Sequence, residues 1–174
     1  GHSIQKIAGA ITLGELDFLL LNKQTQEIEH WEVALKYYLG ENELNLSEWF
    51  GLNRQDTLQR KLRHFTQRQF QFSETSQYTI QRKFAVMKGQ LYLPEHHYAS
   101  SIPEWINTSR RLGQWGTIIP VLPYYRLQRH EWLCPDQHPS SQTAEWWSNG
   151  LYHNADTDPM YYMFRQPVLL FNPA

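Results

Sequence analysis

The chain has 174 residues, a formal net charge of −1, 41% hydrophobic residues and 14% aromatic residues. This length suits one compact domain, and the composition is typical of a packed globule and excludes a disordered chain. The near-neutral charge gives no global sign of a nucleic-acid, membrane or acidic partner, so any basic surface has to be local.

The cysteine content and the hydropathy indicate a cytoplasmic protein. Cys134 is the single cysteine, which excludes an intramolecular disulfide and suits a reducing compartment. No run approaches the roughly 18 apolar residues that span a bilayer, so no membrane partner is expected. The opening residues Gly1–Ser3 are interpreted as the remnant of an expression tag, and a single domain is expected over residues 4–174.

The first half predicts three strands, a helix and a further strand. β-Branched and alternating residues predict strands at Ile4–Ile11, Gly14–Leu21 and Ile28–Leu39. A polar hairpin connection at 22–27 joins the second of these strands to the third. Asn53 and Asp56 resemble a capping pair that opens a helix from Arg54 to Gln69, with apolar residues recurring at helical spacing. Residues 82–94 read as one strand or as a hairpin turning near Gly89.

The second half is rich in aromatic residues and less regular. Residues 101–116 predict a short helix or an ordered loop, 121–135 and 160–173 predict strands, and 143–150 predict one helical turn. Strands interrupted by a helix and followed by mixed elements indicate an α/β domain, bordering on α+β, around a mixed β-sheet.

The second and third predicted strands carry charged residues within apolar runs. Because alternate strand residues share a face, Glu15 lies with Asp17, and Glu32 lies with Lys36. If the strands pair, one face presents Asp17, Glu32 and Lys36 together. The opposite face is then free to pack through Val33, Leu35, Tyr37 and Leu39.

A metal site is one explanation of this cluster. Neighbouring carboxylates repel, and Mg²⁺ or Mn²⁺ relieves that repulsion because both ions prefer hard oxygen ligands. A nearby lysine can orient a water molecule or stabilise developing negative charge, which suits phosphodiester hydrolysis. The alternative is a semi-buried ion pair between Lys36 and one of the acids.

These residues carry a resemblance to known proteins. "GELD", a turn and "WEVALK" resemble the core of the PD-(D/E)XK nuclease superfamily. More specifically, "TLGELDFLL", "HWEVALKYYLG", "GLNRQDTLQRKLRH" and "KGQLYLP" resemble the bacterial family called domain of unknown function 1853.

The resemblance implies a restriction-endonuclease-like core over residues 4–93 and an aromatic-rich extension over 94–174 that packs on it. It implies Asp17 and Glu32 as catalytic metal ligands, helped by a main-chain carbonyl beside Glu32. The superfamily lysine falls where this chain has Ala34, whereas Lys36 lies two positions further along the same face. The first core helix of that fold, which often supplies another acid, would lie upstream of Ile4. Glu15 is a possible accessory acid, with a solvent-exposed role as the alternative.

Basic residues gather on the predicted helix. At 100° per residue Arg54, Lys61 and Arg68 fall near one line, which would suit a phosphate backbone; a solvated face is the alternative. The expected function is a metal-dependent nuclease, a hydrolase of DNA or RNA. The alternatives are an inactive nuclease-like module that binds nucleic acid or a protein partner, and a subunit of a homo-oligomer.

Other residues of ligand type do not form convincing sites. Cys134, Asp136 and His138 are too few for zinc, His96 and His97 are adjacent, and Asp156–Asp158 lacks the rest of a calcium loop. No glycine-rich phosphate loop is present, so no nucleotide or dinucleotide cofactor is expected.

Overall fold

The computed structural model describes residues 1–96, 102–132 and 143–167. They form one mixed sheet of nine strands and one α-helix, α1 (Leu58–Gln67). The strands are β1 (His2–Ala8), β2 (Ile11–Leu21), β3 (Ile28–Gly40), β4 (Trp49–Gly51), β5 (Arg82–Pro94), β6 (Gly113–Gly116), β7 (Tyr125–Arg126), β8 (Gly150–His153) and β9 (Tyr161–Phe164). Short 3₁₀ turns occupy Leu46–Glu48, Gln69–Gln71 and Arg129–Trp132.

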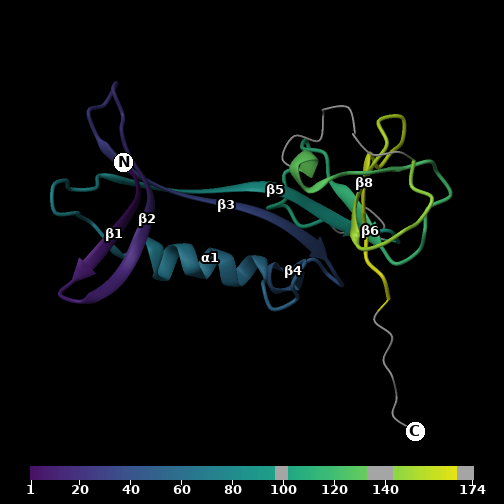
Figure 1. Ribbon diagram of the computed structural model, residues 1–174, viewed down its shortest axis with the longest axis horizontal. Helices are drawn as coiled ribbons and strands as arrows, with labels where there is room; N and C mark the ends of the chain where they lie inside the picture. Colours follow the sequence, from purple (N-terminus) through teal and green to yellow (C-terminus); the bar gives the residue numbers. More distant parts are fainter. Residues whose placement is uncertain (97–101, 133–142, 168–174) are drawn as a thin grey trace, which may run out of the picture.

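The sheet order is β1-β2-β3-β5-β6-β9-β8-β7, with β4 paired to β3 outside this path. The β1–β2, β2–β3, β7–β8 and β8–β9 pairs are antiparallel, while β3–β5, β5–β6 and β6–β9 are parallel. β3 and β5 form a long ribbon that joins the N-terminal hairpins at one end to the short C-terminal strands at the other (Figure 1). The mixed sheet with a single described helix fits the predicted α/β to α+β class.

The first hairpin differs from its predicted limits. β1 ends at Ala8, Gly9 turns the chain with φ of 63°, and Ile11 belongs to β2. His2 lies within β1 and pairs with Phe18, so part of the segment interpreted as a tag remnant belongs to the sheet.

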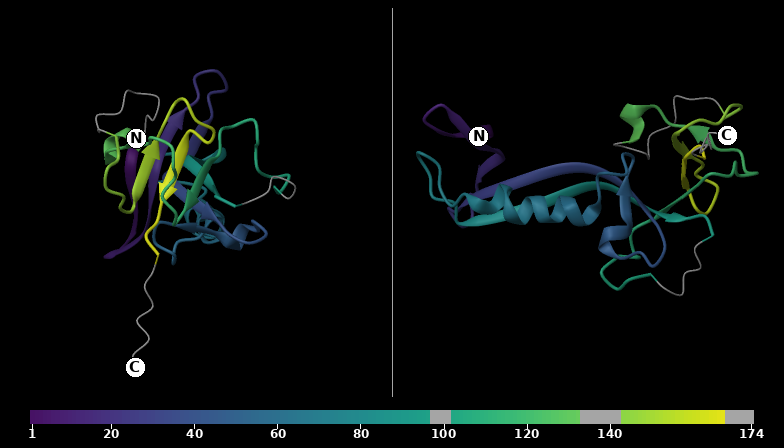
Figure 2. Two further views of the ribbon diagram at one scale, coloured as in Figure 1. Left: turned by 90° about the vertical axis from the view of Figure 1, so that its right-hand side faces the viewer. Right: turned by 90° about the horizontal axis from the view of Figure 1, so that it is seen from below.

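The helix begins later than Asn53 and Asp56 suggested, which corrects that prediction. Asn53 is instead the first residue of a turn, in which its carbonyl accepts a hydrogen bond from the Asp56 N–H at 3.0 Å. Thr57 is the N-cap, and its Oγ1 accepts from the Arg60 N–H at 3.2 Å. α1 lies along one face of the β3–β5 ribbon (Figures 1 and 2), and its Leu58 and Phe65 side chains are buried.

β5 is one continuous strand, which confirms the strand reading of residues 82–94 over the hairpin. It runs parallel to β3 from the Glu29–Arg82 pair to the Leu39–Tyr92 pair. Gly89 pairs with Lys36 in this ladder and has a φ of 131°. A Cβ on Gly89 would lie 1.6 Å from the Lys36 carbonyl oxygen. Only glycine allows the two strands to approach this closely.

The second half confirms one prediction and corrects others. Residues 102–112 form an ordered loop, one of the two predicted alternatives, but residues 113–116 form β6. β7 is far shorter than the predicted strand, and residues 143–150 contain no helical turn, since Gly150 opens β8. β9 confirms the beginning of the last predicted strand, whereas residues 133–135 and 168–173 of the two predicted strands lie outside the described part of the chain.

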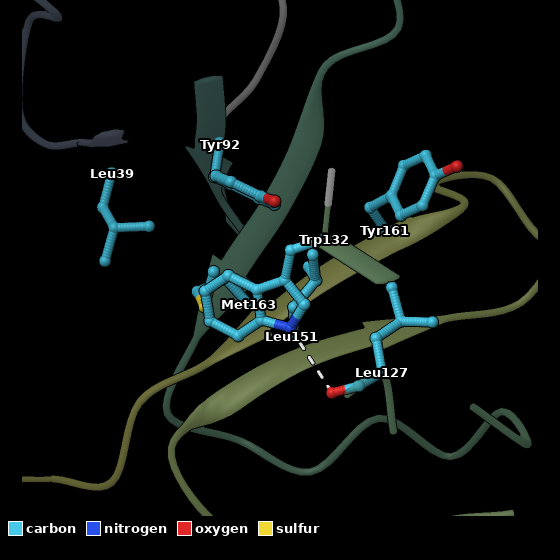
Figure 3. Close-up of a cluster of buried hydrophobic side chains, with 7 residues drawn as sticks. All are labelled: Leu39, Tyr92, Leu127, Trp132, Leu151, Tyr161 and Met163. Atoms are coloured by element: carbon cyan, nitrogen blue, oxygen red, sulfur yellow. Dashed lines mark hydrogen bonds between the residues drawn. The ribbon is translucent and has the colours of Figure 1, made fainter. Parts of the chain in front are cut away.

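One apolar cluster joins the long strands to the C-terminal strands. Leu39 of β3 and Tyr92 of β5 pack with Trp132 and Met163, together with Leu127, Leu151 and Tyr161 (Figure 3). The Trp132 indole donates to the Leu127 carbonyl at 3.3 Å, which satisfies the buried N–H. None of the described helices is long and apolar enough to cross a bilayer.

The two faces of β3 differ in how far their side chains are buried. His30, Glu32 and Tyr38 are buried on the face that α1 covers. On the opposite face Tyr37 and Leu39 contact the apolar cluster, but Val33 and Leu35 remain 41% and 44% exposed. The expected packing of that face therefore holds only for its C-terminal half within the described residues.

Candidate metal centre

Asp17 and Glu32 meet where β2 and β3 part. Their ladder runs from the Leu21–Ile28 pair to the Phe18–Trp31 pair and stops there. Beyond it, each carboxylate accepts a main-chain N–H of the facing strand: Asp17 N–H donates to Glu32 Oε1 at 3.3 Å, and Val33 N–H donates to Asp17 Oδ2 at 2.9 Å. The structure thus brings the two predicted ligands side by side.

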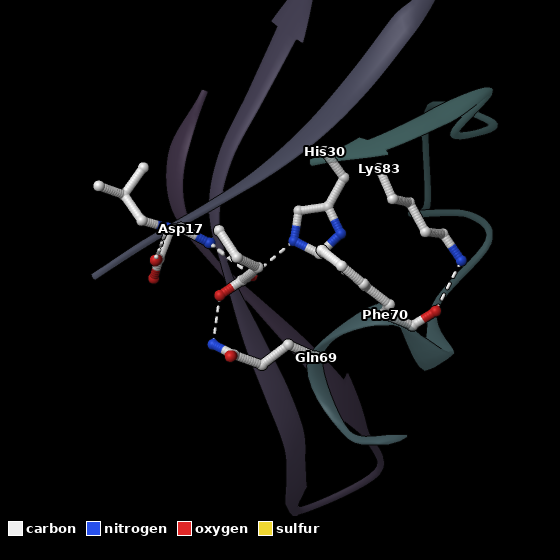
Figure 4. A network of polar contacts seen from close by, with 7 residues as sticks. Asp17, His30, Gln69, Phe70 and Lys83 are labelled. Atoms are coloured by element: carbon white, nitrogen blue, oxygen red, sulfur yellow. Dashed lines mark hydrogen bonds and ion pairs between the residues drawn. The ribbon is translucent and has the colours of Figure 1, made fainter. Parts of the chain in front are cut away.

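Glu32 is fully buried and held by neutral and basic partners. His30 Nε2 lies 2.5 Å from Glu32 Oε1, and the Gln69 amide donates to Oε2 (Figure 4). Burial is the largest effect on Glu32 and raises its pKa, while the hydrogen bond from His30 opposes that rise. The edge of His30 packs on Phe70, with ring centroids 5.6 Å apart, so the imidazole has a fixed orientation.

Two oxygen atoms beside this pair have no hydrogen-bond partner within the described residues. No hydrogen bond occupies Asp17 Oδ1 within the described residues, and Gln69 Oε1 is buried without a partner among them. No described group combines three His, Cys, Asp or Glu side chains as metal ligands. Mg²⁺ is nevertheless commonly held by one or two carboxylates, with waters and substrate phosphates completing the shell. Asp17 and Glu32 could supply such carboxylate oxygens, and both oxygens of Glu32 already accept hydrogen bonds from the chain.

Lys36 shares the face of Glu32 but does not reach the two acids. Four residues along an extended strand span about 13 Å. The Lys36 amine instead forms an ion pair with Asp56, from the turn before α1, and both side chains are 31% exposed. The Tyr38 hydroxyl also donates to Asp56, at 3.4 Å.

Lys61 of α1 is a second amine beside the candidate centre. Its ammonium lies 4.1 Å from the centroid of the Phe65 ring. Burial and then the charge of Lys36 lower the pKa of Lys61, whereas the charges of Glu32, Asp17 and Asp56 act to raise it. Lys61 is therefore within the electric field of both the acid pair and the Lys36–Asp56 pair.

A groove runs from Asp17 along α1, and the buried Glu32 does not line it. Its first part, about 590 Å³, is lined by Glu15 and Asp17 on β2 and by His64, Gln67 and Arg68 across from them. Its second part, about 740 Å³, is also lined by His64, Gln67 and Arg68. Further lining residues of this part include Asp56, Arg60, Lys61 and Arg63. We call the two parts the basic groove. Within the described residues Arg60, Lys61, Arg63 and Arg68 form no ion pair, so their charges are available to an anion.

Arg54 does not belong to this groove, which corrects the predicted row of cations. It precedes α1, forms an ion pair with Glu41 and lies over the Phe50 ring at 4.3 Å. Lys61 and Arg68 do line the groove. Glu15 is exposed beside Asp17 and, among the described residues, forms no hydrogen bond to the acid pair.

Sequence reasoning missed the residues that hold Glu32 and Lys36. His30 lies two residues before Glu32, so strand alternation places both on one face and could have identified the pair. Gln69 and Asp56 gave no local signal, because only the packing of α1 brings them to β3. His97, Cys134, Asp136 and His138, which the sequence did not favour as ligands, lie outside the described residues.

Comparison with known proteins places the chain in a family. No curated protein and no solved structure matches it. One family model, described as "Domain of unknown function (DUF1853)", matches residues 2–166 and so covers the hairpin, α1 and the C-terminal strands. The chain therefore belongs to the DUF1853 family.

Proposed function

We propose that this protein is a metal-dependent nuclease that hydrolyses phosphodiester bonds of DNA or RNA in the cytoplasm. The observation that carries the proposal is the pairing of Asp17 and Glu32 through main-chain hydrogen bonds, with Asp17 at the end of the basic groove. The cations of that groove form no ion pair within the described residues. The resemblance of "GELD" and "WEVALK" to the PD-(D/E)XK nucleases supports the same reaction.

Each part of the chain then has a role. Asp17 and Glu32 would hold Mg²⁺ or Mn²⁺, with His30 and Gln69 keeping Glu32 in place. When bound, the ion would neutralise phosphate charge and make a water molecule more acidic. Lys61, in the field of both acids, would stabilise negative charge that develops on the phosphate, whereas Lys36 is held by Asp56 and does not reach the two acids. Arg60, Arg63 and Arg68 would hold the backbone.

Metal removal tests the proposal. We expect the purified protein to cleave single-stranded or duplex DNA or RNA with Mg²⁺ or Mn²⁺, and to lose that activity in excess chelator and regain it when metal is restored. Metal dependence is expected because two adjacent carboxylates would repel a phosphate unless a cation lies between them. Cleavage that persists in chelator, or no cleavage of any of the four substrates with either metal, would count against it.

The basic groove predicts a salt-dependent affinity. Replacing Arg60 and Arg63 with Gln should weaken oligonucleotide binding and reduce the slope of log K against log salt by about 0.7–0.9 for each phosphate that the variant no longer neutralises. Arg54→Gln is the matched control, because Arg54 is neutralised by Glu41. Equal slopes for the double variant and the control, measured by titration in chelator, would show that the basic groove does not bind the phosphates.

His64 predicts a pH dependence of the same binding. Burial lowers the pKa of His64, and the neighbouring charges of Lys61, Arg68 and Arg60 lower it further. A bound phosphate would raise that pKa, so binding takes up a proton between the free and bound values. Affinity should therefore fall as the pH rises through the His64 pKa, from its lowered value in the free protein to its higher value in the complex, by at most about tenfold per pH unit. His64→Gln should flatten the profile; an unchanged slope in that variant would contradict the assignment.

A binding module without catalysis is the second candidate. Ala34 stands at the usual lysine position and Asp56 engages Lys36, which favour this reading. Salt-sensitive binding of nucleic acid without cleavage would identify it. The exposed Val33 and Leu35 would instead suit a protein partner or a second copy, and concentration-dependent light scattering would detect self-association.

A further inference from the structure

A second cavity lies beyond Lys36, beside residues 87–91 of β5. It holds about 290 Å³, with an apolar floor from Tyr38, Leu58 and Met87. Its far wall is the loop before β6, which contributes Trp105 and Arg110 among others. We call it the Trp105 pocket.

The wall of the Trp105 pocket is preformed. Ile106 is buried in the cluster that also contains Tyr38 and Leu58. The Asn107 carboxamide accepts from the Ser109 N–H and hydroxyl, at 3.0 and 2.6 Å. The Gln90 amide of β5 donates to the Arg111 carbonyl at 3.4 Å. These contacts hold the loop in shape without a ligand.

Trp105 is an exposed aromatic residue on this loop. It is 46% exposed, and Trp49, which is fully buried, supports it in an edge contact with ring centroids 6.0 Å apart. Indole faces stack on nucleobases with little dependence on base identity. An exposed indole beside an apolar floor therefore suits a planar ring.

The rim of the Trp105 pocket is cationic. Lys88, Arg110 and Arg111 line it, and within the described residues none of them forms an ion pair. Arg111 Nη1 contacts Met160 Sδ at 3.2 Å, and Glu104 of the same loop does not line the pocket. The rim is thus suited to an anion attached to the ring.

The pocket and the basic groove lie on either side of one ion pair. Lys36 lines the pocket, and its partner Asp56 lines the groove. A chain of phosphates along the groove could therefore continue into the pocket. A stacked duplex would keep its bases out of such a cavity, whereas an unpaired nucleotide could enter it.

We propose that the Trp105 pocket binds one unstacked nucleotide of a single strand, with the base on Trp105 and the phosphate at Lys88, Arg110 and Arg111. One part of this inference rests on the proposed function, namely that the substrate is single-stranded or locally unpaired nucleic acid. Binding of the nucleotide itself requires neither the metal nor cleavage.

Binding in chelator tests the pocket separately from catalysis. Calorimetry would compare an unlabelled oligothymidylate of about twelve nucleotides with a duplex of equal length. The single strand should bind about tenfold more tightly, and Trp105→Ala should remove about tenfold of that affinity, the effect of losing one stacked base. Trp146→Ala is the matched control, because Trp146 is 86% exposed and lies outside the pocket. Arg110→Ala, which removes an exposed side chain without a described partner, should weaken the same binding if Trp105→Ala proves unstable.

The outcomes separate the two proposals. Selective loss in Trp105→Ala and Arg110→Ala supports the pocket even if no metal supports cleavage, in which case the nuclease proposal alone fails. Equal binding by Trp105→Ala, Arg110→Ala and Trp146→Ala, or tighter binding of the duplex, overturns the pocket whether or not cleavage occurs. Thymidine monophosphate that binds as tightly as the oligonucleotide would overturn the single-strand assignment in favour of a free nucleotide.

Discussion

Asp17→Asn is expected to reduce metal-dependent cleavage by about a thousandfold or more while the fold remains intact. The substitution removes the negative charge that would hold the ion. It keeps the shape of the side chain and an oxygen that can still accept from the Val33 N–H. Because that hydrogen bond survives, the junction of β2 and β3 should keep its geometry.

Glu74→Gln is the matched control for this prediction. Glu74 is exposed and lines neither part of the basic groove. It should retain activity within about threefold, because a solvated charge contributes little to the site. Single-turnover cleavage, with circular dichroism of each variant, makes the comparison. Full activity in a folded Asp17→Asn variant would show that Asp17 is not a ligand.

Gly89→Ala is expected to lower the free energy of unfolding by about 4 kcal/mol, through backbone strain and overpacking together. The added Cβ would lie 1.6 Å from the Lys36 carbonyl oxygen, which cannot move without disturbing the β3–β5 ladder. The φ of 131° is also unfavourable for any residue with a Cβ.

Gly9→Ala separates the collision from the strain. Gly9 also has a positive φ, of 63°, but a Cβ there would meet nothing within 4 Å. Its cost should be only about 1–2 kcal/mol, from the left-handed conformation. Urea unfolding of both variants provides the measurement. Equal decreases in stability would mean that β3 and β5 do not approach as closely as described.

The site was only partly predictable because its components differ in range. Alternation along the strands is local, so the shared location of Asp17 and Glu32 followed from the sequence. The engagement of Lys36 by Asp56 depends on where α1 docks, and no periodicity encodes that. Arg54 was misplaced because Asn53 and Asp56 resemble a cap, whereas Thr57 performs that role four residues later.

The fold was predictable where elements are long. β3 and β5 each extend over 13 residues, so their apolar patterns are clear. β6, β8 and β9 have four residues each, too few to show a period, and pairing with distant strands defines them. The exposure of Val33 and Leu35 was not foreseen, because alternation indicates which residues share a face but not what covers it.

Calorimetric titration of Mn²⁺ into the protein and its Asp17→Asn variant tests the central claim most directly, because it needs no substrate. Saturable binding is expected for the native chain, with binding abolished in the variant. No binding to either protein, or equal binding to both, would contradict the metal centre and leave Asp17 and Glu32 as acids satisfied by their neighbours alone.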